Sequence, residues 1–118
     1  MLIISTTNEL VRVPAERIVY ISSDGNYSVM VLHDGTEHLF SFNLSQFQKL
    51  LEKQMKSEAE IFIRLGKSLI VNRKYIYKIH VGKQQLVLSD MKLSRSFVLS
   101  PSKEALRLLK NLIESAGK

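Results

Sequence analysis

Residues 17–42 read RIVYISSDGNYSVMVLHDGTEHLFSF, and this stretch decides the fold class. Three apolar runs rich in β-branched and aromatic residues are separated by Asp24-Gly25-Asn26 and by Asp34-Gly35. Glycine and asparagine tolerate a positive φ, and Asp-Gly between apolar runs is the strongest short-range hairpin pattern. The stretch therefore predicts an antiparallel meander with strands at 17–23, 27–33 and 36–42.

Short strands are also expected on both sides of this meander. LIIS at 2–5 and LVRV at 10–13 predict a first hairpin. In 61–65, Ile61, Ile63 and Leu65 alternate with Phe62 and Arg64, which is typical of a half-buried strand. Apolar runs predict further strands at 68–71, 75–81, 85–89 and 91–94.

Two segments have helical spacing instead. Asn43 followed by Gln46 makes a capping-box pattern ahead of apolar residues three and four apart, which predicts a short helix at about 44–54. Ser100 as a cap and Pro101 in the first turn precede an apolar stripe and predict a C-terminal helix at about 101–115. The expected fold class is mainly β, with short antiparallel sheets and these two helices. With 118 residues and neither a repeat nor a linker, we expect a single domain at 1–118.

The composition excludes several functional classes. Hydrophobic residues make up 45% and charged residues 24% of the chain, and no apolar run approaches the roughly 18–20 residues that a bilayer span needs. The first residues have neither a basic nor an apolar region of the kind that export signals have. Cysteine is absent, which excludes disulfides, zinc-thiolate sites and cysteine nucleophiles. We expect a cytoplasmic protein without a membrane partner.

The net charge of +6 is concentrated in one region. Residues 61–103 contain nine basic residues and one acid, a net of +8, while the other 75 residues contain eight basic and ten acidic residues, a net of −2. Such a regional surplus is expected of a surface that meets a polyanion such as DNA. Lysines on the solvent faces of strands need no ligand, so a β-rich protein-interaction module with a merely solubilising basic patch stays open. Stacking on single strands is only weakly indicated, because Tyr75 and Tyr77 alternate with Ile76 at strand spacing.

The sequence argues against catalysis. His33 and His38 flank the Asp34-Gly35 turn, but two histidines without a third ligand make a weak metal site. His80 stands alone on a predicted strand, and the acids are scattered singly. The glycines do not approach a nucleotide-binding loop pattern. We therefore expect no enzyme activity, no cofactor and no metal.

Three turns combine hydroxyls, cations and an aromatic residue in ways that suit nucleic acid. They are 22–27 with Tyr27, 64–68 with two cations around Gly66, and 94–96 with an arginine between two serines. Hydroxyls and lysines commonly bind phosphate, and arginine can also bind O6 and N7 of guanine with two hydrogen bonds. The first of these turns could equally be an ordinary hairpin.

Four segments in order resemble one known family. They are RIVYISSDGNYSVMVLHDG, FNLSQFQKLL, FIRLGKSLIVNRKYIYKI and KLSRSF. From about Arg12 to Leu112 the chain resembles the LytTR DNA-binding domain, the output module of many bacterial response regulators. The resemblance implies an elongated, mostly antiparallel β domain that inserts loops into successive major grooves of double-stranded DNA, in place of a recognition helix. Its implied function is sequence-specific transcriptional regulation.

By position in these motifs, Tyr27, Lys67 and Arg95 fall where the family's three groove-facing loops make contacts. Arg64, Ser68, Arg73 and Lys74 also fall on the family pattern and are expected to bind DNA. Asn26 and Ser96, in the first and third of the turns above, are expected to do so as well. Arg64 is expected either to clamp the DNA backbone or to pair with an acid such as Glu60. Asn72 is expected either to contact DNA or to tie down a turn through its side chain.

The chain departs from the family pattern in two ways. Gly66 stands where the family often has histidine, so a common DNA contact is missing and base preference is expected to differ. Family members usually follow a receiver domain, for which 118 residues leave no room. We expect either a separate output domain or a stand-alone regulator, with a receiver or sensor as partner and paired or repeated DNA sites as target.

Overall fold

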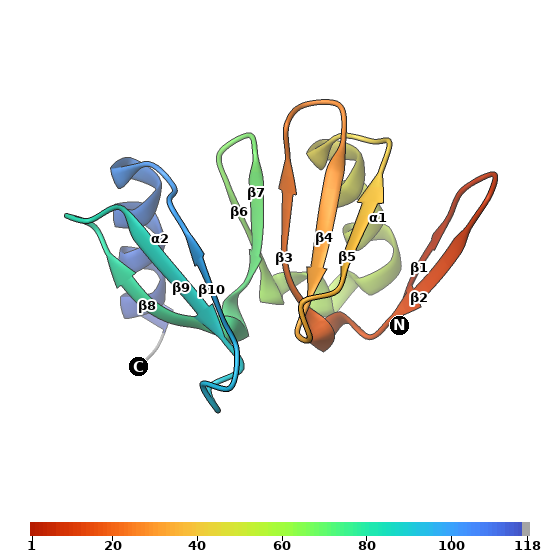
Figure 1. Cartoon of the computed structure of the whole chain (residues 1–118). Helices are drawn as coiled ribbons and strands as arrows, with labels where there is room; N and C mark the ends of the chain where they lie inside the picture. Colours follow the sequence, from red (N-terminus) through yellow and green to blue (C-terminus); the bar gives the residue numbers. More distant parts are fainter. Residues whose placement is uncertain (117–118) are drawn as a thin grey trace. The chain divides into compact units, whose positions relative to one another are not determined.

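The computed structural model describes residues 1–116, apart from the side chains of residues 57–59. The chain divides into two compact units, Met1–Lys74 and Tyr75–Lys118 (Figure 1). Within the described residues the strands form a five-stranded, a three-stranded and a two-stranded sheet, with antiparallel pairing in each. With one helix in mid-chain and one near the C-terminus, this confirms the mainly β fold class. Among the described helices, none combines the length and apolarity that crossing a membrane requires.

The five-stranded sheet belongs to the first unit and has the order β5-β4-β3-β7-β6. Its strands are β3 (Ile18–Ser23), β4 (Ser28–Leu32), β5 (Glu37–Phe40), β6 (Phe62–Leu65) and β7 (Leu69–Asn72). The meander predicted at 17–42 is confirmed as β3-β4-β5, and glycines at positive φ occupy both of its turns. Every residue of β7 is buried, and β7 joins the meander to β6 by pairing with β3.

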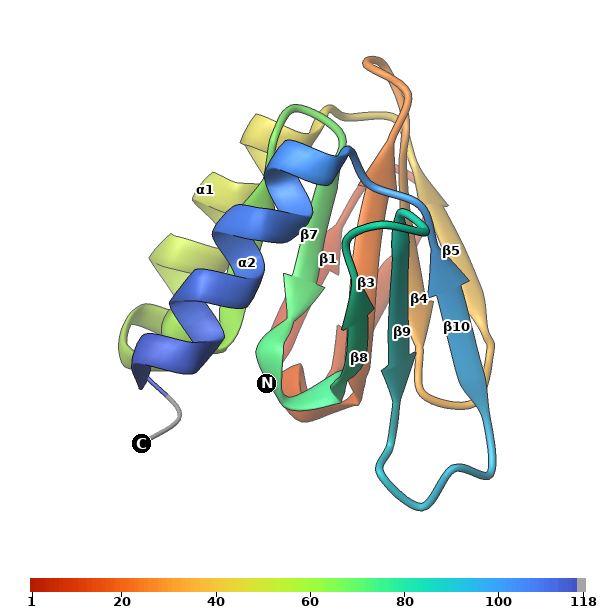
Figure 2. The same cartoon turned by 90° about the vertical axis from the view of Figure 1, so that its left-hand side faces the viewer.

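Helix α1 (Leu44–Met55) covers one face of this sheet (Figure 2). The predicted capping box is confirmed. The Asn43 side chain accepts the Gln46 N–H at 2.9 Å, and the Asn43 N–H donates to the Gln46 side chain at 2.9 Å. Helix α1 buries Phe47 and other apolar side chains in a core shared with Ile21, Met30 and Ile70 of the sheet. Burying an apolar side chain of this size contributes on the order of 1.5–3 kcal/mol, so core contacts hold the helix in place.

The first hairpin was also predicted correctly and consists of β1 (Leu2–Ser5) and β2 (Leu10–Val13). Leu2 and Ile4 point into the same core. On β1, the main-chain N–H of Ile3 donates to the side-chain oxygen of Gln54 at 2.8 Å, and the side-chain nitrogen of Gln54 donates to the Ile3 carbonyl at 2.7 Å. Gln54 thereby binds the edge of β1 as a neighbouring strand would, which anchors the hairpin to α1.

The second unit consists of a three-stranded sheet and a helix. The sheet has the order β10-β9-β8, from β8 (Ile76–His80), β9 (Gln85–Ser89) and β10 (Ser96–Leu99). Helix α2 (Lys103–Ala116) runs along this sheet (Figure 2). Leu86 and Leu88 of β9 and Leu106 and Leu109 of α2 are fully or almost fully buried, so apolar burial holds this unit together as well.

Two predictions for the second unit were wrong. Residues 91–94 are not a strand, because Met91 and Leu93 have φ of 70° and 59°, which extended backbone does not allow. The strand starts at Ser96 instead, so Arg95 precedes a strand rather than following one. The cap of the last helix is Ser102, not Ser100. Its hydroxyl accepts the Ala105 N–H at 3.1 Å.

The half-buried strand predicted at 61–65 was correct except at its first residue. Ile61 ends a short 3-10 helix, and β6, an edge strand, starts at Phe62. Phe62 packs against the core under α1 and Arg64 donates to side chains of α1, so these two residues share one face of β6 as the alternation predicted. The period-2 pattern identified the strand and placed its start one residue too early.

Candidate nucleic-acid interface

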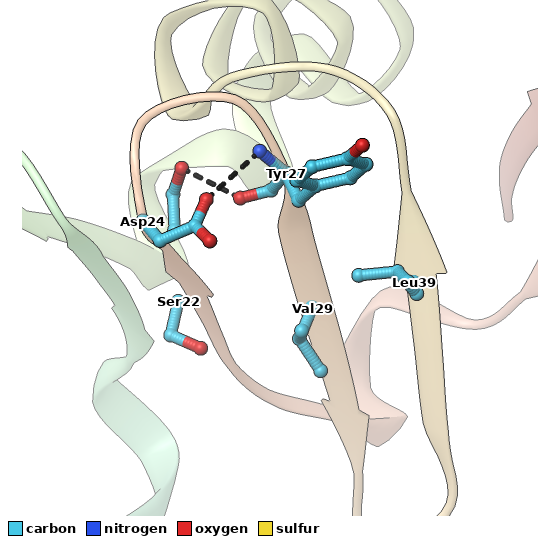
Figure 3. A pocket seen from close by; sticks show the side chains of 6 residues that line it. Ser22, Asp24, Tyr27, Val29 and Leu39 are labelled. Carbon is cyan, nitrogen blue, oxygen red and sulfur yellow. Dashed lines mark hydrogen bonds between the residues drawn. The ribbon is translucent and has the colours of Figure 1, made fainter.

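The turn between β3 and β4 presents Tyr27, and its own side chains hold it in shape (Figure 3). The Ser23 hydroxyl donates to the Tyr27 carbonyl at 2.8 Å, and one Asp24 carboxylate oxygen accepts the N–H groups of Asn26 at 3.3 Å and Tyr27 at 3.1 Å. Gly25 has a φ of 112°, which other residues rarely adopt. Asn26 and Tyr27 are exposed, Tyr27 by 48%. The turn is therefore preorganised, and it exposes the Asn26 amide and the Tyr27 ring in fixed positions.

A hollow of about 430 Å³ adjoins the tyrosine. Its lining residues are Ser22, Ser23, Asp24, Tyr27, Val29 and Leu39. Ser22 pairs with Val29 and Val29 with Leu39, so these three side chains form one row across β3, β4 and β5 (Figure 3). The hollow is mostly apolar, with hydroxyls and a carboxylate along one side.

The turn between β6 and β7 presents Lys67 and Ser68, both exposed. Gly66 begins it with a φ of 67°, and a Cβ at this position would meet nothing within 4 Å. The Ser23 N–H donates to the Ser68 carbonyl at 2.9 Å, which links this turn directly to the end of β3. The turns that present Tyr27 and Lys67 therefore lie at the same end of the five-stranded sheet (Figure 1).

Between these turns and the start of α1 lies a second hollow, of about 370 Å³, which we call the basic hollow. Its lining residues are Ser23, Gly25, Asn43, Leu44, Ser45, Arg64 and Lys67. It combines two cations with hydroxyl and amide side chains. Asn43 and Ser45 were not among the predicted site residues, because the sequence pattern explained Asn43 fully as a helix cap.

Arg64 points toward α1 and the β6–β7 turn. Its Nε donates to the Gly66 carbonyl at 2.9 Å, and one terminal nitrogen donates to the Ser45 hydroxyl at 3.1 Å and to the Gln48 side-chain oxygen at 2.8 Å. In the described part of the chain Arg64 bonds to these neutral acceptors and forms no ion pair with Glu60, which was one of the two alternatives expected for it.

Arg73 and Lys74 lie at the other end of the sheet from Lys67, since they directly follow the last residue of β7. The structure does not bring them together with the turns of Tyr27 and Lys67. The turn they form is tied down by Asn72, as one of the two predictions for this residue had it. The fully buried Asn72 side chain donates to the Ile18 carbonyl at 2.9 Å and accepts the Lys74 N–H at 2.9 Å.

Arg95 ends the loop between β9 and β10, and Ser96 is the first residue of β10; both belong to the second unit and are exposed. Asp90 organises this loop. Its carboxylate accepts the Ser94 hydroxyl at 2.8 Å and the Lys92 N–H at 3.0 Å. The Ser94 hydrogen bond, with help from main-chain N–H groups and the Lys92 charge, lowers the pKa of Asp90. The sequence showed Asp90 only as the lone acid of the basic region.

The fold and these turns define a class of protein: a β-rich chain that presents cations and hydroxyls on the turns between its strands. A model of the LytTr DNA-binding domain matches residues 8–114. The chain therefore belongs to the LytTr DNA-binding domain family, which is non-catalytic.

Solved structures with the same fold include the LytTr DNA-binding domain of a protein named as a methyl-accepting/DNA response regulator, from Bacillus cereus. The two chains share 21% sequence identity, the match covers 94% of each, and the TM-score is 0.62. No curated protein matches the chain.

Proposed function

We propose that this chain is a bacterial transcriptional regulator that binds specific sequences of double-stranded DNA by inserting its turns into the major groove. One observation carries the proposal. The turns that present Tyr27 and Lys67 lie at one end of one sheet and are joined by the hydrogen bond from Ser23 to Ser68. Two rigid turns held at a fixed spacing can enter a groove without having to order on binding.

The residues at these turns suit distinct parts of DNA. Lys67 and Ser68 have the cation and hydroxyl that bind phosphate oxygens, and Lys67 can also reach a guanine edge. The Tyr27 ring offers apolar contact, and Asn26 offers an amide that can bind adenine with two hydrogen bonds. Arg95 in the second unit has the geometry to bind guanine O6 and N7, with the Ser96 hydroxyl beside it.

The two units work in this proposal as a single DNA-binding domain at 1–118. The family match supports this, because it runs through both units from residue 8 to residue 114. Arg73 and Lys74, at the far end of the first sheet, contact phosphates away from the base-reading turns. The targets are paired or repeated sites, and the protein works in the bacterial cytoplasm, where a receiver domain or sensor controls it.

The proposal is tested by selecting bound sequences from a random duplex library at ~150 mM salt, where sequence-independent electrostatic binding is already weak. An enriched motif, bound roughly 10³-fold or more tightly than random duplex, is the expected result. A protein-interaction module with a solubilising basic patch would enrich no motif, and that result would refute the proposal. Tighter binding to single-stranded than to duplex DNA would refute it as well.

Single substitutions then separate base contacts from general charge. Arg95→Ala is expected to cost about 1–3 kcal/mol on the selected site and to relax the preference at one position. Lys110→Ala removes the same charge from helix α2, where Lys110 pairs with Glu114 at 3.1 Å, and serves as the matched control. Equal weakening of every duplex by Arg95→Ala would show that Arg95 does not read a base.

A further inference from the structure

Arg64 differs from the other predicted DNA-binding residues because its guanidinium already donates hydrogen bonds to oxygens of the protein itself. Two of its nitrogens donate three hydrogen bonds, to Gly66, Ser45 and Gln48, at 2.8–3.1 Å. All three acceptors are neutral oxygens. The side chain is half-buried, and part of it lines a small recess under α1 with Gln48 and Ile70. It is therefore held in one pose before any ligand arrives.

The three acceptors come from two elements far apart in the chain. Gly66 starts the β6–β7 turn, whereas Ser45 and Gln48 lie three residues apart on one side of the first turns of α1. The planar guanidinium is suited to this, since it presents several donors in a fixed fork and a lysine ammonium does not. The side chain thus bridges the helix to the main chain of the turn.

The bridge matters for the residues of the turn itself, which lie beyond the Leu65–Leu69 pair that closes the hairpin. A Cβ at Gly66 would meet nothing within 4 Å, and Gly66, Lys67 and Ser68 are all exposed. The Ser68 carbonyl is held by the Ser23 N–H, and the Gly66 carbonyl is held by Arg64. In addition to the Leu65–Leu69 pair, one hydrogen bond therefore holds the carbonyl at each end of the three-residue turn that presents Lys67.

We propose that Arg64 is a positioning residue, which acts on DNA through the β6–β7 turn and makes no DNA contact of its own. This inference rests on the proposed DNA-binding function. Arg64 fixes the Gly66 carbonyl against helix α1, so that Lys67 and Ser68 are already in their bound positions before DNA binds. Ordering a mobile side chain on binding weakens an interface roughly 3- to 10-fold, and this is the loss that Arg64 prevents.

A phosphate contact by Arg64 makes different predictions, and two variants separate the alternatives. Arg64→Lys keeps the positive charge but loses the fork. Gln48→Ala leaves every charge unchanged and removes the acceptor at the shortest distance. If Arg64 contacted a phosphate, Arg64→Lys would keep most of the affinity for DNA, and Gln48→Ala would not change it. A positioning role requires that both variants loosen the turn and weaken specific binding.

The first measurement needs no DNA. Amide relaxation and hydrogen exchange of Gly66, Lys67 and Ser68 are followed by NMR in the 118-residue chain, with circular dichroism as the check on folding. Both variants are expected to increase mobility at these three amides while the amides of the β9–β10 loop, in the second unit, stay as in the parent. Unchanged amides at the β6–β7 turn in both variants would overturn the proposal whatever the DNA data show.

The second measurement compares affinity for the selected duplex with affinity for random duplex. Arg64→Lys is expected to lose roughly 3- to 10-fold on the selected duplex and much less on random duplex. Gln48→Ala should lose in the same direction, and the double variant should lose less than the product of the two single effects, because both break one bridge. If Arg64→Lys bound the selected duplex as tightly as the parent does, the positioning role would be overturned. If the parent chain itself enriches no motif, the proposed function fails, and the NMR result still decides whether Arg64 orders the turn.

Discussion

Replacing Asn72 by alanine tests the buried hydrogen bonds that hold the end of β7. The Asn72 side chain is fully buried and donates to the Ile18 carbonyl and accepts the Lys74 N–H, both at 2.9 Å. Alanine leaves both main-chain groups without a partner, and each such loss costs about 1–3 kcal/mol. Because water can reach the Lys74 N–H in part, we expect a loss of about 2–4 kcal/mol in the free energy of unfolding.

The measurement is urea denaturation followed by circular dichroism, since the chain has no tryptophan. Lys74→Ala is the matched control, because it removes a neighbouring exposed side chain and keeps the N–H that Asn72 accepts. It should change stability by less than about 0.5 kcal/mol. A loss below about 0.5 kcal/mol for Asn72→Ala would refute the claim that these two bonds hold the turn.

Asn72→Asp sharpens the same test through pH. At neutral pH the carboxylate can still accept the Lys74 N–H, but it cannot donate to the Ile18 carbonyl, and it is a buried charge. Burial raises the pKa of such an aspartate, so protonation restores a donor as the pH falls. The stability difference between this variant and the parent should therefore shrink on acidification. A difference that stays constant or grows would contradict the assigned hydrogen bonds.

Three further predictions concern other parts of the chain. Gly66→Ala should lower the free energy of unfolding by about 1 kcal/mol, because Gly66 has a positive φ. Gly66→Asn should lower it less, since asparagine tolerates this conformation. Equal losses for the two variants would argue against backbone strain. Because the pKa of Asp90 is lowered, its hold on the β9–β10 loop is present above the unfolded-state pKa and is lost as pH falls through the folded-state pKa. Ser94→Ala should move this loop transition, followed by NMR, to higher pH, and an unchanged midpoint would remove the serine as the main cause. Gln54→Ala should speed hydrogen exchange in the first hairpin, beginning at Ile3, and unaltered exchange would mean that the amide clamp contributes nothing.

Most secondary structure could be predicted because its causes are local. The β3-β4-β5 meander follows from alternating apolar residues and two glycine turns, and the capping box at Asn43 set the start of α1. The predictions failed where the neighbouring residues alone do not determine the local structure. The segment 91–94 looked like a strand, but Asp90 and Ser94 form hydrogen bonds that fold it into a loop with left-handed residues.

The candidate site divides in the same way. The turn residues Tyr27, Lys67 and Arg95 could be named from sequence, because motifs and local composition mark them. That β7 returns to pair with β3, and so sets the Lys67 turn beside the Tyr27 turn, could not be read from either segment alone. Strand pairing over such a separation depends on the burial of β7, every residue of which is buried and of which Ile70 belongs to the core under α1.

The sequence by itself determined the mainly β class, the two helices, the family and the basic character of the turns, since these depend on residue type and short-range spacing. The tertiary structure alone decided what Arg64 does. A motif places an arginine on β6, but only the packing of α1 brings Ser45 and Gln48 within hydrogen-bond distance of its guanidinium. A side chain's partners are set by which elements the hydrophobic core brings together, and that information is spread over the whole chain.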